Sequence, residues 1–193
     1  MKRRRILLLL ALVVVAMACV LFWPRGPAEP VYQGRKLSEW LEDSFQGQEA
    51  ETRRAAEQAV QRMGTNALPW LMSEFSRRDP KWKAATRRWL AKQSWTNGRI
   101  RTEEYRIWLA ANGLYILRPA TALPELSGYL GDEQRGDAVA QVLSATKEPA
   151  IPYLLRAIDS TNTQAGVNAM SSLGLMAEHT EAAIPLLVQA LRA

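Results

Sequence analysis

The chain has 193 residues, which is enough for one domain with a well-buried interior. Its 48% hydrophobic and 23% charged residues exclude an intrinsically disordered chain, and its single cysteine, Cys19, excludes an internal disulfide framework and a thiol-ligated zinc site. The net charge of +6 does not indicate a nucleic-acid partner, because residues 31–193 hold 20 basic and 18 acidic residues. Alanine and leucine dominate the apolar residues, which favours helices over strands.

The first element is an apolar segment behind a cluster of cations. Residues 1–5 read MKRRR, and residues 6–23 follow as 18 residues without a charge. Such a run spans about 30 Å of hydrocarbon as a helix, and the cations beside it stay in the cytoplasm. We therefore predict a transmembrane signal anchor at 6–23, single-pass in the inner (cytoplasmic) membrane, with a cytoplasmic basic region at 1–5 and an extracytoplasmic domain behind it.

Two other fates of this segment stay open. Cleavage after Ala18 fits the rule of small residues before a signal-peptide cut, because Ala16 and Ala18 flank Met17. Lipid attachment at Cys19 is the second, although Ala16 stands where a large aliphatic residue is usual. Each of the three fates places residues 31–193 outside the cytoplasm.

A proline-rich linker follows. Residues 24–30 contain three prolines and one glycine, a composition typical of a stiff, extended spacer. We assign the linker to residues 24–35 and a helical repeat domain to residues 36–193.

A proline pattern recurs within this domain. Two apolar residues precede each proline and a leucine stands two positions after it, at Pro69, Pro124, Pro152 and Pro185, which are 55, 28 and 33 residues apart. Proline lacks an N–H and suits a first helical turn, so each copy predicts a helix start. The wide first gap predicts a degenerate copy or an insertion at about 80–106.

A second pattern places small residues on one helix face. It reads Ala-x-x-Ala-Val-x-x-Met-Gly at 56–64 and Gly-x-x-Ala-Met-x-x-Leu-Gly at 166–174, with looser copies from Ala110 and Ala138. The spacing i, i+3, i+4, i+7 is one face of an α-helix, and small residues there let a neighbouring helix approach.

The two patterns alternate, so the repeating unit is a pair of helices. We expect Asn66 and Thr121 to cap the proline-led helices, and Gly64 and Gly174 to end the small-residue helices. Neither helix can bury its apolar stripe alone. The prediction is therefore an all-α solenoid of stacked antiparallel helix pairs behind the transmembrane helix.

These residues resemble HEAT repeats, in particular the short bacterial form. Ala-Ile-Pro-x-Leu-Leu on one helix is similar to the family's pattern, as is the small-residue face of the next, with Arg53 and Arg135 at the family's basic position. The opening segment 32–41 also resembles that of bacterial HEAT proteins with an N-terminal anchor. The resemblance implies a fold and a role in protein binding; the family shares no common chemistry, ligand or cofactor.

One stretch does not repeat and is strongly basic. Residues 77–106 carry ten basic and three acidic residues. Nine of the ten cations form a possible surface for an anionic partner: Arg77, Arg78, Lys81, Lys83, Arg87, Arg88, Lys92, Arg99 and Arg101; the tenth is Arg106. The favoured interpretation of the tryptophans here is a core stripe of Trp82, Ala85 and Trp89, with Lys81, Arg88 and Lys92 facing water; an exposed cationic, aromatic surface is the alternative.

We find no catalytic signature. There is no Gly-x-Ser-x-Gly elbow, phosphate loop or dinucleotide fingerprint, and the only histidine, His179, stands near a predicted helix end, where a structural role is favoured. The predicted function is therefore a membrane-anchored scaffold for an unidentified protein partner and not an enzyme. The alternative is an envelope accessory module that docks on anionic lipid or polymer through residues 77–106.

The last predicted helix has no second helix after it. Solenoids usually end in a polar cap. We therefore expect a partner, or a second copy of the chain, to cover the apolar face formed by Ile184, Leu187, Val188 and Leu191.

Overall fold

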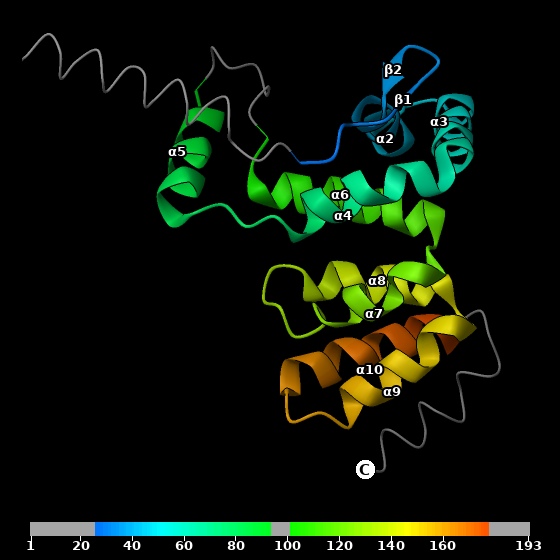
Figure 1. Cartoon of the computed structure of the whole chain (residues 1–193), viewed down its shortest axis with the longest axis vertical. Helices are drawn as coiled ribbons and strands as arrows, with labels where there is room; N and C mark the ends of the chain where they lie inside the picture. The colour runs from blue at the N-terminus through cyan, green and yellow to red at the C-terminus, as the bar shows by residue number, and fades with distance from the viewer. Residues whose placement is uncertain (1–25, 94–100, 178–193) are drawn as a thin grey trace, which may run out of the picture.

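The computed structural model describes residues 26–93 and 101–177 (Figure 1). Apart from one short β-hairpin, the regular structure in these two ranges is helical, so the predicted all-α class is confirmed for them. The predicted membrane span at 6–23 lies outside both ranges. Within them, no helix combines the length and the apolar character needed to cross a bilayer.

The helices follow one another in pairs. The described helices are α2 (Leu37–Gln46), α3 (Ala50–Met63), α4 (Leu68–Ser76), α5 (Lys81–Ala91), α6 (Glu103–Leu117), α7 (Leu123–Ser127), α8 (Gly136–Thr146), α9 (Ile151–Ile158) and α10 (Thr163–Ala177). Helix α2 packs on α3, α4 on α6, α7 on α8 and α9 on α10, and each pair lies against the next (Figure 1). This arrangement is compatible with an α-solenoid.

The described chain begins with a β-hairpin that packs on α2. Strands β1 (Val31–Tyr32) and β2 (Arg35–Lys36) pair antiparallel across a two-residue turn with φ angles of 51° and 77°. The indole nitrogen of Trp40 in α2 donates to the Tyr32 carbonyl at 3.1 Å. The predicted linker is therefore too long, because residues 31–35 belong to the folded unit.

The same kind of link leads from one pair to the next at three places. Helices α3, α6 and α8 each end at a residue with positive φ, which is 53° at Gly64, 48° at Arg118 and 64° at Lys147. A short 3-10 turn then leads into a helix with proline in its first turn. These turns are η1 (Gly64–Ala67), η3 (Ala120–Ala122) and η4 (Glu148–Ala150). The predicted helix starts at the first three prolines are confirmed.

Three predicted helix ends are wrong. Asn66 and Thr121 do not cap helices, because they lie within the 3-10 turns and the chain continues from these turns into the helix without a side-chain cap. Gly174 lies inside α10, which continues to Ala177. Gly64 does end α3 with positive φ, although its ψ of −132° differs from that of a left-handed helix.

Helix α5 stands outside this pairing. Its sequence neighbours α4 and α6 pack on each other, and Figure 1 shows α5 beside the stack. None of its residues is buried. The wide gap between Pro69 and Pro124 therefore holds an inserted helix, and among the described residues no second new helix completes a pair with it.

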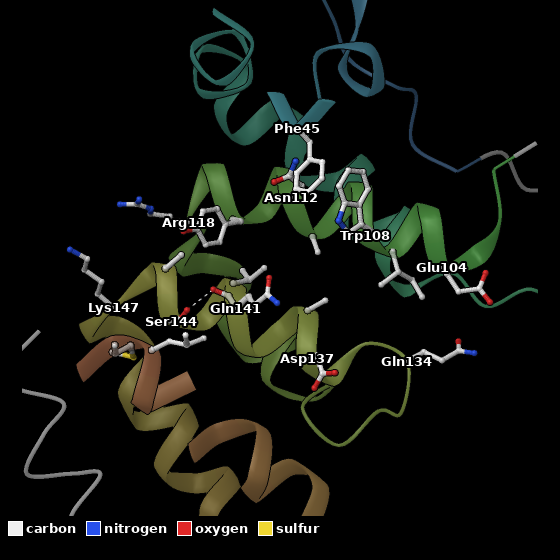
Figure 2. Close-up of a pocket in the computed structure, with 18 residues that line it drawn as sticks. Phe45, Glu104, Trp108, Asn112, Arg118, Gln134, Asp137, Gln141, Ser144 and Lys147 are labelled. Atoms are coloured by element: carbon white, nitrogen blue, oxygen red, sulfur yellow. Dashed lines mark hydrogen bonds between the residues drawn. The ribbon is translucent and has the colours of Figure 1, made fainter. Parts of the chain in front are cut away.

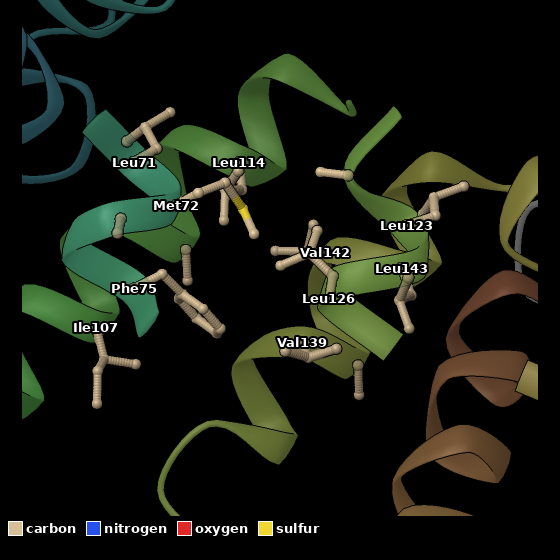
Figure 3. Close-up of a cluster of buried hydrophobic side chains, with 14 of the residues drawn as sticks. Leu71, Met72, Phe75, Ile107, Leu114, Leu123, Leu126, Val139, Val142 and Leu143 are labelled. Carbon is tan, nitrogen blue, oxygen red and sulfur yellow. The ribbon is translucent and has the colours of Figure 1, made fainter. Parts of the chain in front are cut away.

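The core runs through the stack from one pair to the next. Figure 3 shows its middle part, where Leu71 and Phe75 of α4 and Leu114 of α6 lie opposite Val142 of α8. A Cβ atom at Gly113 of α6 would lie 2.6 Å from a methyl carbon of Leu71. The small residue at this position thus lets α4 approach α6 closely.

A glycine at the start of α8 gives a direct test of the packing between pairs. A Cβ at Gly136 would lie 2.2 Å from the amide nitrogen of Asn168 and 2.6 Å from the carbonyl oxygen of Leu130, which Asn168 binds at 2.7 Å. We expect Gly136→Ala to lower the free energy of unfolding by about 2–3 kcal/mol in a urea titration. The matched change Gly174→Ala meets no atom within 4 Å and should raise stability by up to about 1 kcal/mol. Equal effects of the two changes would contradict this packing.

Candidate protein-binding groove and basic surface

Large apolar side chains are exposed at two main places on the described surface. Phe45, Tyr115 and Leu175 are exposed around a groove between α6 and α8. Trp82 and Trp89 are exposed on α5. Val31 and Val167 are the other exposed large apolar residues, and they lie apart on the hairpin and on α10. Exposed apolar groups that gather in this way usually mark contacts with another molecule.

The groove runs between the second helices of two successive pairs, which carry the small-residue pattern. It has a volume of about 740 Å³ and is lined mainly by α6 and α8, with Phe45 of α2 and the end of α10 at its margins. Phe45 meets Trp108 of α6 edge to face, with ring centroids 4.3 Å apart. Ala111 of α6 and Ala138 of α8 are both in the lining, where their small side chains take up little space. Figure 2 shows the side chains that line the groove.

The two ends of the groove carry opposite charge. Figure 2 shows Arg118 and Lys147 at one end, and Glu104 and Asp137 toward the other. No carboxylate of the described residues lies within ion-pair distance of Arg118 or Lys147. The pKa of Glu104 lies below its usual value, chiefly because its own backbone N–H donates to the carboxylate, and Arg88 also lies beside it. The groove is therefore mainly apolar between a cationic and an anionic end, with the polar side chains of Asn112, Gln141 and Ser144 also in its lining.

Both cations occupy backbone positions that favour glycine. Lys147 has φ 64° and ψ −136°, nearly the conformation of Gly64 at the corresponding end of α3, with φ 53° and ψ −132°. Arg118 is in the left-handed helical region, with φ 48° and ψ 56°. Side chains in such conformations cost about 1–3 kcal/mol, and they are frequent at binding sites.

The basic segment 77–106 is largely neutralised in three dimensions. Seven of its ten cations lie within 4.0 Å of a carboxylate: Arg77, Arg78, Lys83, Arg87, Arg88, Arg101 and Arg106. Three of the partner carboxylates, on Glu42, Glu74 and Asp132, come from outside the segment. Lys81 and Lys92 are exposed without such a partner in the described part of the chain. Arg99 lies outside the described residues.

The buried carboxylate of Asp79 forms ion pairs with several of these cations. Its carboxylate is 1% exposed; it accepts a hydrogen bond from Arg87 at 2.9 Å and lies 3.0 Å from a terminal nitrogen of Arg106. Arg106 is itself buried, and none of its guanidinium nitrogens has an aligned hydrogen-bond acceptor. Its charge is therefore compensated by Asp79, and at 3.5 Å by Glu74, without the geometry of a hydrogen bond.

Arg135 joins three elements at a second buried junction. Its side chain is 1% exposed and donates to the carbonyl oxygens of Phe75 at 2.8 Å and Arg77 at 3.2 Å, and to the Glu103 carboxylate at 3.0 Å. It thus ties the end of α4 and the start of α6 to the start of α8. In the sequence, only the position of Arg135 in the repeat pattern indicates that it is important. No sequence pattern predicts that Arg106 and Asp79 are buried.

Asp132 completes the junction around Arg135. Burial by itself would raise the pKa of its carboxyl group. The backbone N–H of Gln134 and the guanidinium groups of Arg135 and Arg78 outweigh burial, so that the pKa of Asp132 lies below its usual range. The carboxylate stays charged and holds Arg135 in place.

The predicted core stripe on α5 is wrong. Trp82 is 72% and Trp89 61% exposed, and Ala85 is exposed between them. The reason is that Lys83 and Arg87 turn the opposite side of the helix toward Asp79. The alternative interpretation, an exposed aromatic surface next to cations, describes α5.

Some of the candidate residues are not part of the described ranges. The C-terminal face of Ile184, Leu187, Val188 and Leu191 lies outside the described residues, as do His179 and Cys19. Among the residues that are described, no three His, Cys, Asp or Glu side chains come together in a way that could hold a metal ion. No family model matches the chain, and no curated protein or solved structure matches it either.

Proposed function

We propose that the protein is a membrane-anchored scaffold, a HEAT-like α-solenoid that holds a segment of a partner protein in the groove between α6 and α8. The observation that carries this proposal is the groove itself, where three of the exposed apolar residues gather between charged ends. Apolar grooves between helices are a common way to bind an amphipathic helix of a partner.

The ends of the groove define the chemistry of the partner segment. Arg118 and Lys147 suit an acidic group at one end, and Glu104 and Asp137 suit a basic group at the other. Between them, the aromatic rings of Phe45, Trp108 and Tyr115 suit large apolar side chains. The partner segment is therefore apolar in its middle and oppositely charged at its two ends, which fixes its direction in the groove.

The location is part of the same proposal. The cationic residues 1–5 and the apolar residues 6–23 support a single-pass anchor in the cytoplasmic membrane with the repeat domain on its outer side. Absence of the chain from carbonate-washed membranes would contradict the anchor without bearing on the groove.

A substitution of Lys147 can test whether the groove binds the partner, because it should weaken binding without lowering the stability of the fold. Because its backbone conformation favours glycine, Lys147→Gly should raise the free energy of unfolding by about 1 kcal/mol. The same change removes a cation from the groove and should weaken capture of an acidic partner segment. The measurement is quantitative mass spectrometry of proteins that copurify from detergent-solubilised membranes, beside a urea titration.

Two further variants control this experiment. Tyr115→Ser should lower the same copurified proteins, because it removes an exposed ring from the groove. Val167→Ser removes an exposed apolar side chain outside the groove and should leave them unchanged. If Lys147→Gly and Tyr115→Ser retain every protein that Val167→Ser retains, the groove does not bind the partner.

A further inference from the structure

We propose that α5 is a membrane-contact helix that lies flat on an anionic bilayer surface and orients the anchored repeat domain. Trp82 and Trp89 enter the headgroup region, and Lys81, Arg88 and Lys92 meet anionic headgroups. The proposal rests on the membrane anchor of the proposed function but is independent of the groove and its partner.

The orientation of α5 is the reverse of that of an ordinary surface helix. Its inner side carries Lys83 and Arg87, which reach the buried carboxylate of Asp79. Its outer side carries Trp82 and Trp89. A surface helix of a soluble domain normally turns its apolar stripe inward, so an outward stripe indicates a second apolar environment.

The two tryptophan rings can contact the same bilayer surface. They are seven residues apart, which is about two helical turns and about 10 Å along the axis, so both rings point to the same side. Only small or short side chains, Ala85 and Thr86, lie between them on this face. Tryptophan is enriched at the membrane–water interface because its ring is amphipathic.

The charges of α5 select an anionic surface. The helix contains no acidic residue, and Lys81 adjoins Trp82 while Arg88 adjoins Trp89. Lys81 and Lys92 are exposed and have no carboxylate within ion-pair distance among the described residues, and the Arg88 side chain is 60% exposed beside Glu104. With 3.6 residues per turn, Lys81, Arg88 and Lys92 lie along one side of the helix, about a quarter to a third of a turn from the two tryptophans. Cations that flank an aromatic face in this way are typical of helices that bind anionic membranes.

The first described residues of the chain lie near the end of α4 and near α5. A Cβ at Gly26 would lie 3.2 Å from the Ser73 hydroxyl near the end of α4, and Glu29 shares a cleft with Arg87 of α5. The predicted span ends at residue 23, and residues 24–29 reach at most about 20 Å when extended. A bilayer at the end of this tether is therefore within reach of α5.

The test uses the full chain reconstituted in vesicles and a probe on the outer face of α5. Cys19→Ser with Ala85→Cys leaves one thiol for a fluorophore, and Cys19→Ser with Val167→Cys gives the control position on α10. Quenching by acrylamide reports exposure to water, and quenching by a lipid-borne nitroxide reports contact with the bilayer. The vesicles contain phosphatidylcholine alone or with phosphatidylglycerol, and carbonate extraction checks the anchor separately.

With phosphatidylglycerol present, the probe at position 85 should be shielded from acrylamide and quenched by the lipid nitroxide, whereas the probe at 167 should stay exposed. Lys81→Glu with Lys92→Glu should lower the ratio of docked to undocked protein by at least about fivefold per residue. This factor corresponds to roughly 1 kcal/mol of attraction between each cation and the anionic surface. Trp82→Ser with Trp89→Ser should abolish the nitroxide quenching.

Two results would overturn the proposal. Shielding of position 85 from acrylamide without quenching by the lipid nitroxide would show that protein, either this chain or a second copy, covers α5. A fully exposed probe on anionic vesicles, with the chain resistant to carbonate, would show that the anchor is present but that α5 does not touch the membrane.

Discussion

Replacing Arg135 with methionine should lower the free energy of unfolding by about 3–5 kcal/mol, the usual effect of removing one partner from a buried ion pair. The change leaves the carboxylate of Glu103 and the carbonyl oxygens of Phe75 and Arg77 without this donor. These groups lie where α4, α6 and α8 meet, so the loss affects the contact between the second and third helix pairs. A urea titration of the full chain in mild detergent measures the effect.

Arg78 provides the matched control, because it binds the same Asp132 from the surface. Its side chain is 69% exposed, and exposed ion pairs contribute at most about 1 kcal/mol. We therefore expect Arg78→Met to change stability several times less than Arg135→Met. Equal losses would mean that Asp132, and not the donors of Arg135 inside the junction, holds these helices together.

Asp79→Asn should have a comparable effect, again about 3–5 kcal/mol, because it removes the charge nearest to the buried Arg106. It also removes the carboxylate that attaches Lys83 and Arg87 of α5. We expect faster amide hydrogen exchange over residues 81–91 together with the loss of global stability. Exchange measured by mass spectrometry, beside a urea titration, reports both effects.

Two further variants sharpen this result. Asp79→Asn with Arg106→Met removes both buried charges and should be less destabilised than Asp79→Asn alone, because a buried guanidinium is no longer left without its nearest carboxylate. Glu104→Gln removes the charge of the exposed pair with Arg88 but keeps a side-chain oxygen that can accept the residue's own backbone N–H, so it should leave both stability and the exchange of α5 nearly unchanged. A double variant that is less stable than the single one would contradict the assigned role of Asp79.

The sequence predicts the helices better than it predicts their surroundings. The prolines predict the starts of α4, α7 and α9, because proline at the first turn of a helix has a local physical cause. The caps at Asn66 and Thr121 are wrong because a 3-10 turn already supplies carbonyl acceptors before each helix. That turn depends on how the preceding helix ends, which no local pattern reports.

The errors around α5 have a different cause. Helical spacing shows that Trp82 and Trp89 share a face, but it does not show whether the face points inward. Asp79 decides this by attracting the cations on the opposite face. The local excess of charge in 77–106 is likewise misleading, because Glu42, Glu74 and Asp132 reach the segment from other elements.

The groove could not be found in the sequence for a related reason. Phe45, Tyr115 and Leu175 come from three helices far apart in the chain, and only the stacking of pairs brings them to one site. Lys147 is the one indication of the groove in the sequence, because a lysine stands at the end of α8 where the corresponding end of α3 has Gly64.

The most direct test of the scaffold proposal is site-specific photocrosslinking in intact cells. A benzoylphenylalanine at position 115 faces the groove, and one at position 167 on α10 lies outside it. The proposal predicts a discrete crosslinked protein from position 115 that is absent from position 167 and that weakens in the Lys147→Gly background. No adduct at 115, or the same adduct from both positions, would contradict the groove as the site that holds the partner.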